Sequence, residues 1–302
     1  MGLMQTLRER LAFRSWYTDQ IAAKLDRIKL CAEKTAILTK QTAILTKERY
    51  VAELFAAEKY RDPLRLEPHG FKVYSQNDED GIIAEIFRRI GSPGRTFVEF
   101  GVEDGLENNT LYLLLQGWRG LWIDGNEGFV KKIRSRFDEV IQSDRLSVTH
   151  SFITRDNINS TIGHFAKGEI DLLSIDIDGN DYHIWEAVEV VRPRVVVIEY
   201  NSKFPPPISI APAYVPDRVW QGDDYMGASL EAIVRLGKRK GYSLVGCNIT
   251  GIDAFFVRDD LVENKFARPF TAENHYHPPR YFLSPLYTAG HRPTWGQYVE
   301  IS

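Results

Sequence analysis

The chain has 302 residues, of which 43% are hydrophobic and 26% charged, and its formal net charge is −3. This composition is that of an ordinary globular protein, and the small negative charge gives no reason to expect a nucleic acid or an anionic membrane surface as a partner. No apolar run approaches the ~18 residues of an integral membrane segment, and the two cysteines, Cys31 and Cys247, lack metal-site or disulfide spacing, so we expect a cytoplasmic protein.

Residues 1–60 predict a helix, because they contain no Pro and no Gly after Gly2. Within them "TAILTKQ" is followed directly by "TAILTKE", and this seven-residue repeat forms two adjacent apolar rows: Leu30, Ile37, Ile44 and Val51, with Cys31, Leu38, Leu45 and Ala52 beside them. Two heptads are fewer than the ~3–4 that define a coiled coil. The helix either packs on its own domain or joins copies of the chain, and we expect the second, a homo-oligomer.

Residues 61–74, with two Pro and a Gly, predict a linker. The following "YSQNDEDGIIAEIFRRIG" predicts a helix that Ser75 or Asn77 caps. We therefore expect the main domain to cover residues 75–260.

Strand and helix patterns then alternate, which predicts a parallel sheet with helices on both faces. The expected strands are 96–100, 120–124, 146–152, 170–177 and 194–200, and the expected helices are 109–117, 128–137, 158–165, 182–191 and 229–241. The last two strands, 242–247 and 253–260, are joined by only five residues, too few for a parallel crossover. The sheet should therefore end in an antiparallel hairpin strand.

Two segments outside this alternation are candidates for shaping a binding site. The Pro-rich residues 201–226 follow the carboxyl end of a strand, where loops of this length are usually lids or binding loops. The tail, 261–302, is rich in Pro, Tyr and His and either packs as a surface tail or covers the same site. We assign it to capping the site.

A glycine turn follows the first strand in "FVEFGVEDG". Gly101 and Gly105 let the backbone approach a ligand closely, but the spacing is not GxGxxG and no Lys follows. Glu99 and Glu103 would repel a phosphate and tolerate a ligand with an amino group and a sulfonium. Asp124 ends the next strand, about 20 residues further on, where an acidic residue accepts hydrogen bonds from ribose hydroxyls.

The stretch "FVEFGVEDGLENNTLYLLLQGWRGLWIDGN", with the later "IDIDG", resembles the S-adenosylmethionine site of FkbM-like and related class I methyltransferases over roughly residues 74–260. The resemblance implies a Rossmann-like α/β sheet and S-adenosylmethionine as cofactor. It puts the Gly turn near the methionine part, Asp124 near the ribose, and Ser151 and Phe152 beside the adenine. Either Asn109 or Thr110 would bind the carboxylate. The other cofactor residues that we assign on this likeness are Gln76, Glu99, Glu103, Gly125, Asn126 and Asp176. In this sequence Asp124 stands where many such enzymes have Glu.

Acidic and amide side chains end two neighbouring strands: Asp176 and Asp178 the fourth, Glu199 and Asn201 the fifth. Adjacent parallel strands lie ~4.8 Å apart, so these groups should meet, and a hard divalent cation such as Mg²⁺ relieves the crowding of carboxylates. The arrangement resembles the metal site of catechol and macrolide-sugar O-methyltransferases. Tyr200 splits the Glu–Asn pair, which leaves open whether Asn201 is a ligand. In the alternative without metal, Asp176 binds the amino group of the cofactor.

These features together predict a metal-assisted methyl transfer to a hydroxyl, with Asp181 or His183 as the base. Asp181 could instead cap the helix that follows it, and His183 could lie on the surface of that helix. Aromatic residues of the 201–226 loop, and His275 or His277, would shape a pocket for a small-molecule or glycan acceptor, such as a sugar or natural product. A metal-independent methyltransferase and a non-catalytic scaffold on the same fold are the alternatives.

Overall fold

The computed structural model describes residues 2–283 and 298–301 of the chain, which divides into one unit that ends at Arg61 and another that begins at Asp62. The first unit consists of the helix α1 (Gly2–Phe55) and a short 3-10 helix, η1 (Glu58–Arg61). The apolar side chains of its repeat are open to solvent: the exposed fractions of Leu30, Ile37 and Ile44 are 50%, 58% and 47%. Because α1 and η1 cover nearly all of residues 1–60, the predicted helical N-terminal segment is confirmed.

The second unit is built on a seven-stranded sheet in the order β3-β2-β1-β4-β5-β8-β7. Strands β1 to β5 are mutually parallel, whereas β8 is antiparallel to both β5 and β7. Their bounds are β1 (Thr96–Phe100), β2 (Arg119–Asp124), β3 (Leu146–His150), β4 (Gly168–Ile175), β5 (Val191–Glu199), β7 (Tyr242–Cys247) and β8 (Asp253–Arg258). This is the predicted Rossmann-like α/β sheet, parallel with a terminal antiparallel strand, and the fold class is confirmed.

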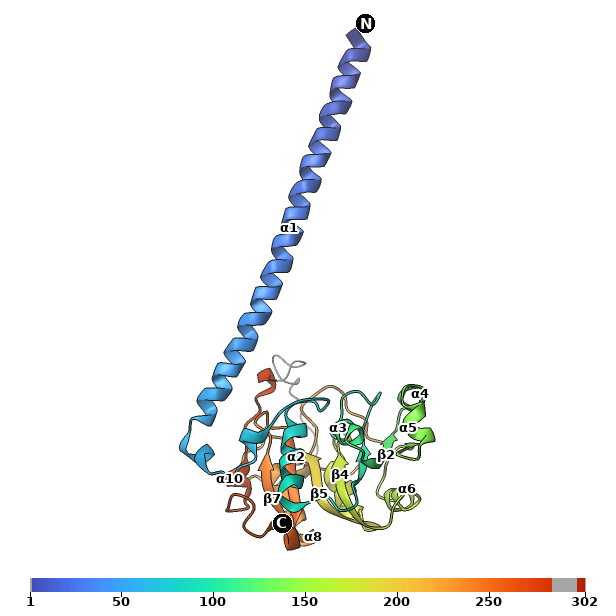
Figure 1. Ribbon diagram of the computed structural model, residues 1–302, viewed down its shortest axis with the longest axis vertical. Helices are drawn as coiled ribbons and strands as arrows, with labels where there is room; N and C mark the ends of the chain where they lie inside the picture. The colour runs from blue at the N-terminus through green and yellow to red at the C-terminus, as the bar shows by residue number, and fades with distance from the viewer. Residues whose placement is uncertain (1, 284–297, 302) are drawn as a thin grey trace. The chain divides into compact units, whose positions relative to one another are not determined.

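Helices lie on both faces of this sheet (Figure 1). Their bounds are α2 (Glu79–Ile90), α3 (Leu111–Leu115), α4 (Glu127–Arg136), α5 (Asp138–Gln142), α6 (Ile158–Gly163), α7 (Asp181–Ala187), α8 (Leu230–Lys240), α9 (Asp259–Val262) and α10 (Ala272–His275). The helix expected over 182–191 was predicted too long. Val188 has an extended backbone (φ −66°, ψ 118°), and the β-branched residues after it start β5 at Val191.

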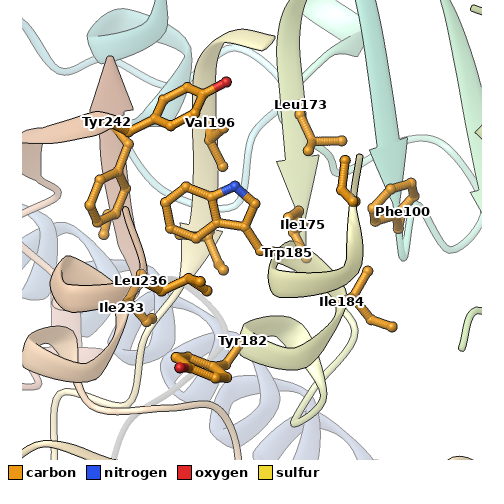
Figure 2. Packing of buried hydrophobic residues seen from close by; sticks show 14 of the residues in the cluster. Phe100, Leu173, Ile175, Tyr182, Ile184, Trp185, Val196, Ile233, Leu236 and Tyr242 are labelled. Carbon is orange, nitrogen blue, oxygen red and sulfur yellow. The ribbon is translucent and has the colours of Figure 1, made fainter. Parts of the chain in front are cut away.

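Alternation along each strand divides the core between the two faces. In β1, Phe97 packs with the residues of α2 and α3, and Phe100 packs with those of α7 and α8. Trp185 lies in the second cluster between Val196, Leu236 and Tyr242 (Figure 2). Its ring also lies 5.0 Å from that of Phe256. A side chain at Gly237 would come within 2.8 Å of Phe256, so a glycine is needed for α8 to approach this ring.

The segments outside the sheet are also packed. Residues 61–74, expected to be a linker, lie from Asp62 onward within the second unit, and Leu66 and Glu67 are buried in it; a 3-10 helix, η2, spans Glu67–His69. The 201–226 loop contains β6 (Ile210–Pro212), which pairs with β9 (Tyr298–Glu300) of the tail. The tail also forms the 3-10 helix η3 (Tyr281–Leu283), and residues 284–297 and 302 lie outside the described part. Within the described part, no helix has both the length and the apolar character needed to cross a membrane.

Candidate active site

A cavity of about 660 Å³ lies at the edge of the sheet where the parallel strands end. That is within the ~300–1,000 Å³ of ligand pockets. The strand order places the ends of β3, β2 and β1 on one side of it and those of β4 and β5 on the other. The expected site residues that line it are Gln76, Glu99, Gly101, Glu103, Asn109, Asp124, Gly125, Asn126, Ser151, Phe152, Asp176, Asp178 and Glu199.

The glycine turn after β1 brings two parts of the cavity wall together. Gly101 has φ 72°, and a Cβ there would lie 1.7 Å from the backbone oxygen of Asp176. No other residue fits this contact between the ends of β1 and β4. Gly105 is different: it packs against Phe137 and Trp122 and does not line the cavity, so its role is in the core.

Asp124 ties the turns after β1 and β2 together. Its Oδ2 accepts from the backbone N of Glu103 (2.8 Å) and its Oδ1 accepts from the backbone N of Asn126 (2.7 Å). Asn126 in turn caps α4 by accepting from the backbone N of Gly128. Burial raises the pKa of Asp124 above its usual value. A carboxylate held in this way at the end of β2 can accept hydrogen bonds from a ribose.

Glu99 lines the cavity, and its carboxylate accepts several hydrogen bonds. It accepts from the backbone N of Asn109 (2.8 Å), from Ser174 Oγ (3.1 Å) and from the Thr110 hydroxyl. Burial nevertheless raises the pKa of Glu99 to about 7. Thr110 Oγ1 also accepts from Trp122 Nε1 (2.7 Å), is fully buried and does not line the cavity. The structure therefore does not bring Thr110 to the expected carboxylate-binding position.

Asn108 is a cavity residue that the sequence analysis missed. Its Oδ1 accepts from the backbone N of Thr110 (3.1 Å) and Leu111 (2.8 Å), whereas its buried Nδ2 has no partner among the described residues. Buried donors are rarely left unpaired, so this amide is a candidate for binding a ligand oxygen. The "ENNT" motif contains two adjacent Asn residues, and no local pattern distinguishes the one with the free amide from the other.

Three carboxylates form the acidic centre of the cavity. One oxygen each of Asp176, Asp178 and Glu199 lies within 4.8 Å of the others. Burial first, and then repulsion from neighbouring carboxylates of the cluster, raises the pKa values of Asp176 and Glu199 well above the usual range. Burial, and then the charges of Asp181 and Glu103, raises the pKa of Asp178 to about 7. Glu199 Oε2 is buried and has no hydrogen-bond partner within the described residues. An unpaired oxygen in a crowded oxygen cluster fits a hard divalent cation.

Three other expected site residues, Asn201, Asp181 and His183, do not line the cavity and instead make hydrogen bonds that stabilise the fold. Asn201 does not line the cavity; its Nδ2 donates to the carbonyls of Asp224 (2.9 Å) and Met226 (2.7 Å) and closes the long loop. Asp181 accepts from the backbone N of Ile177 and Gly179 (both 2.8 Å) and holds the turn after β4.

His183 is a correction of the same kind. Its Nε2 lies 2.8 Å from the carbonyl of Pro212, its side chain is buried, and it is not a cavity residue. Burial lowers the pKa of His183. Because the helix α7 turns this ring towards the long loop, neither His183 nor Asp181 contacts the cavity as a base must.

Asp253 is a second cavity residue that the sequence analysis missed. It is the first residue of β8, and because β8 is antiparallel its start lies at the same edge as the ends of the parallel strands. Burial, and then the charge of Glu79, raises the pKa of Asp253 well above its usual value. The predicted antiparallel strand was the signal that could have located this carboxylate.

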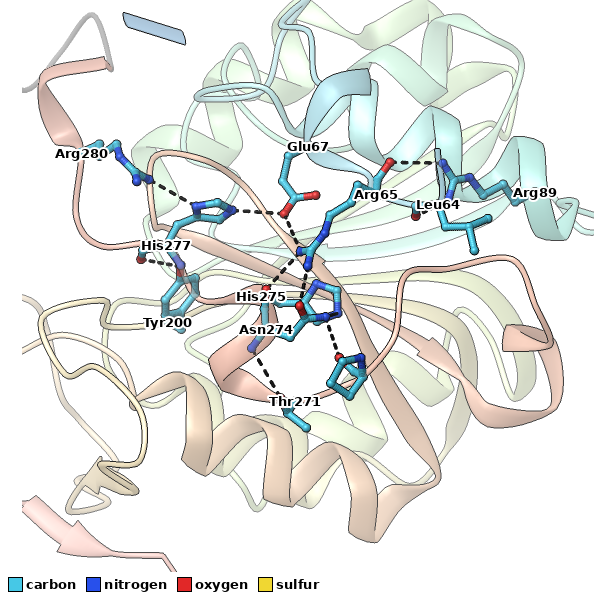
Figure 3. A network of polar contacts seen from close by, with 11 residues as sticks. Leu64, Arg65, Glu67, Arg89, Tyr200, Thr271, Asn274, His275, His277 and Arg280 are labelled. Atoms are coloured by element: carbon cyan, nitrogen blue, oxygen red, sulfur yellow. Dashed lines mark hydrogen bonds and ion pairs between the residues drawn. The ribbon is translucent and has the colours of Figure 1, made fainter. Parts of the chain in front are cut away.

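Residues of the long loop and of the tail form the outer wall: Arg218, Val219, Trp220, Met226 and Tyr281. Tyr281 directly follows a stretch of the tail, His277 to Arg280, that polar contacts hold in place. These contacts form a row of four side chains, Arg65, Glu67, His277 and Arg280 (Figure 3). In that row Glu67 Oε1 lies 3.3 Å from Arg65 Nη1 and 3.2 Å from His277 Nε2, and Arg280 Nη1 lies 3.2 Å from His277 Nδ1. Burial by itself would raise the pKa of Glu67, but the hydrogen bond and charge of His277, with Arg65, lower it to about 2.

This polar row also decides the roles of the two tail histidines. His277 belongs to this row, and His275 is buried with its Nε2 3.4 Å from Asn274 Nδ2; neither lines the cavity, so they do not shape an acceptor pocket by contact. Their part is to anchor the segment that carries Tyr281.

Comparison with known proteins finds no matching family model and no matching curated protein. Among solved structures the chain is similar to an O-methyltransferase from Bacillus cereus in complex with SAH (18% identity, 70% of this chain and 89% of that one, TM-score 0.40). It is also similar to magnesium protoporphyrin IX methyltransferase from Synechocystis PCC 6803 with bound SAM (13%, 70% and 97%, 0.41). A third is an S-adenosylmethionine-dependent methyltransferase from Clostridium acetobutylicum (11%, 70% and 98%, 0.39). These likenesses are remote, so the chemistry has to be inferred from the cavity of this chain.

Proposed function

We propose that this chain is an S-adenosylmethionine-dependent O-methyltransferase that is assisted by a divalent cation, with Mg²⁺ the expected ion. The observation that carries the proposal is that a single cavity contains two different half-sites. Asp124 and the Gly101 turn form one half, at the ends of β1 and β2, and the cluster of Asp176, Asp178 and Glu199 forms the other. A methyl donor and a hydroxyl acceptor need two such half-sites side by side.

The first half-site supports the cofactor. S-adenosylmethionine would supply an activated sulfonium methyl group. In our proposal Asp124 accepts hydrogen bonds from its ribose, Ser151 and Phe152 flank its adenine, and the free Nδ2 of Asn108 donates to its carboxylate. The acidic lining suits a ligand whose amino group and sulfonium are both positive.

The second half-site supports the metal. Asp176, Asp178 and Glu199 would hold the cation, and Asn201 would not, because its amide binds the long loop. A bound cation makes a nearby hydroxyl more acidic; on zinc the pKa of water falls from ~15.7 to ~7, and Mg²⁺ does less. Asp178 has φ 54°, an unfavourable backbone conformation that, outside glycine, is often found at functional sites.

The proton released by the acceptor needs a base within the cavity, and Asp253 takes the place that was expected for Asp181 or His183. Asp253 lines the cavity, and it pairs with Glu199 across the β5–β8 ladder. Burial raises the pKa of Asp253, so its carboxylate, when ionised, is a stronger base than that of an exposed aspartate.

For the acceptor we propose a hydroxyl of a sugar, glycan or ring-shaped natural product. The outer wall offers the rings of Trp220 and Tyr281, which suit a ring-shaped ligand. Calorimetry with S-adenosylhomocysteine tests the proposal. Binding is expected, and its absence would leave the non-catalytic alternative. Turnover that is unchanged by EDTA would show a metal-independent enzyme instead.

A further inference from the structure

Among the described residues that line the cavity, Arg218 is the only basic one. The acidic lining residues are Glu99, Glu103, Glu107, Asp124, Asp176, Asp178, Glu199 and Asp253. A single arginine among so many carboxylates would be expected to pair with one of them. Within the described residues it does not: none of its nitrogens lies within 4.0 Å of a carboxylate oxygen, and its buried Nη1 has no hydrogen-bond partner.

The side chain is held firmly even though its nitrogen is unpaired. Its Cδ lies only 2.8 Å from where a Cβ at Gly179 would be, so the stem packs on the turn that follows Asp178. Its guanidinium carbon lies 4.1 Å from the centre of the Tyr225 ring. Asn180 Nδ2 donates to the carbonyl of Val215 (2.8 Å) and ties this part of the loop to the same turn. Arg218 is therefore a preorganised donor beside the carboxylate cluster.

From these contacts we propose that Arg218 binds an anionic group, a carboxylate or a phosphate, on the methyl acceptor. The inference rests on the proposed function and narrows its substrate class to an acidic sugar or a sugar phosphate. The planar guanidinium suits both anions, because it donates two parallel hydrogen bonds to either. With the anion at Arg218, the neighbouring turn would direct a hydroxyl of the same ligand towards Asp178 and the rest of the cluster.

The cofactor carboxylate is the competing anion. The unpaired amide of Asn108 lies in the "ENNT" segment between β1 and α3, whereas Arg218 packs on the turn after β4. Two separate unpaired donors on different walls of one cavity are explained by two anionic groups, one on each ligand. The acceptor is the ligand expected beside the carboxylate cluster, so Arg218 is assigned to it.

The test compares three probes by calorimetry on the full chain with S-adenosylhomocysteine and Mg²⁺: methyl glucuronide, glucose 1-phosphate and the neutral methyl glucoside. Wild type should bind at least one of the two acidic probes more tightly than the neutral one, and the preferred acid identifies the anion. The substitution Arg218→Gln should weaken that binding about tenfold or more, as expected for the loss of a charged hydrogen bond. The matched control is Arg155→Gln, since Arg155 also lies over a tyrosine ring, that of Tyr214, but outside the cavity.

Several results would overturn the proposal: no binding of any probe by wild type, equal binding of acidic and neutral sugars, or acidic binding that survives Arg218→Gln. A large loss of S-adenosylhomocysteine affinity in Arg218→Gln would assign the arginine to the cofactor instead. Failure of the proposed function itself is distinguishable, because wild type would then not bind S-adenosylhomocysteine at all.

Discussion

Glu199, the last residue of β5, pairs in register with Asp253, the first residue of β8, and both side chains line the same cavity. The pairing is possible because β8 runs against the other strands and so starts where they end. It brings a fourth carboxylate beside the cluster of Asp176, Asp178 and Glu199. The repulsion from Asp253 contributes to the raised pKa values of both Asp176 and Glu199.

Removing the charge of Asp253 should therefore stabilise the metal-free protein at high pH. The substitution Asp253→Asn keeps the shape and removes one source of repulsion, so the melting temperature at pH 8 should rise by about 2–4 °C per kcal/mol gained. At pH 5, where the cluster is largely protonated, little change is expected. Thermal melts at both pH values check this, and an equal shift at both would contradict the electrostatic origin. In the proposed function, the same variant should lose turnover.

The raised carboxylate pKa values also predict the pH dependence of stability in EDTA. A carboxylate whose pKa is higher in the folded state contributes stability that is present at low pH and is lost as the pH rises through the folded value. For Glu99 and Asp178 that value is about 7. His275, whose pKa burial lowers to about 4, acts in the opposite direction below its usual value of 6.5. The melting temperature should therefore fall between pH 6.5 and 8, and a flat or rising curve would contradict the cluster.

Mg²⁺ should reverse this loss at pH 8. A ligand at 100 times its dissociation constant stabilises the folded state by about 2.7 kcal/mol. Asp178→Asn should abolish the shift in melting temperature, and Asn tolerates the positive φ of this position. The control is Glu107→Gln, a cavity carboxylate outside the cluster that pairs with Lys72 (3.0 Å). A shift that persists in Asp178→Asn and vanishes in Glu107→Gln would place the metal elsewhere.

Asn108→Asp tests the assigned role of the unpaired amide. Oδ1 of the new side chain can still cap the backbone N of Thr110 and Leu111, so the fold should be retained. Its second oxygen replaces the free donor with a negative charge facing the cofactor carboxylate. The affinity for S-adenosylhomocysteine should fall by about tenfold or more in calorimetry, with no large change in melting temperature. Unchanged affinity would remove Asn108 from the cofactor site.

His183→Gln should leave ligand binding intact, because His183 contacts the carbonyl of Pro212 and not the cavity. We expect the affinities for S-adenosylhomocysteine and Mg²⁺ to stay within about twofold of the wild-type values. The melting temperature should fall, because the variant loses a buried hydrogen bond that contributes about 1 kcal/mol to stability. Calorimetry and thermal melts of the same preparation measure both. A selective loss of ligand binding would return His183 to the active site.

The exposed repeat of α1 carries our proposal of a homo-oligomer. In the full chain, Ile37→Glu with Ile44→Glu puts two charges into the apolar row and should convert an oligomer into a monomer, as measured by light scattering after gel filtration. The control is Thr39→Glu with Thr46→Glu, which changes the corresponding repeat positions about 200° around the helix. A wild-type chain that is already monomeric would rule out self-association through this helix.

Much of the architecture was predictable, because alternation and helical periodicity are local properties of a sequence. The strand ends at Phe100, Asp124, Ile175 and Glu199 lie within two residues of their expected places. The gathering of Asp176, Asp178 and Glu199 followed, since parallel strands end at one edge of a sheet. Element boundaries in less regular segments were harder to predict. The helix expected to reach residue 191 ends at Ala187, because the valines that follow it favour the strand β5.

What each polar side chain at that edge does was decided only by the tertiary structure. Asn201, Asp181 and His183 have the chemistry of site residues, yet each is engaged by a backbone group that folding brings near. The residues that complete the cavity come from distant parts of the chain, as Arg218 and Asp253 do. The sequence by itself thus determined the sheet and the place of its acidic edge. Buried hydrogen-bond partners, which depend on the folded packing of remote segments, determined which of those side chains remain available to a ligand.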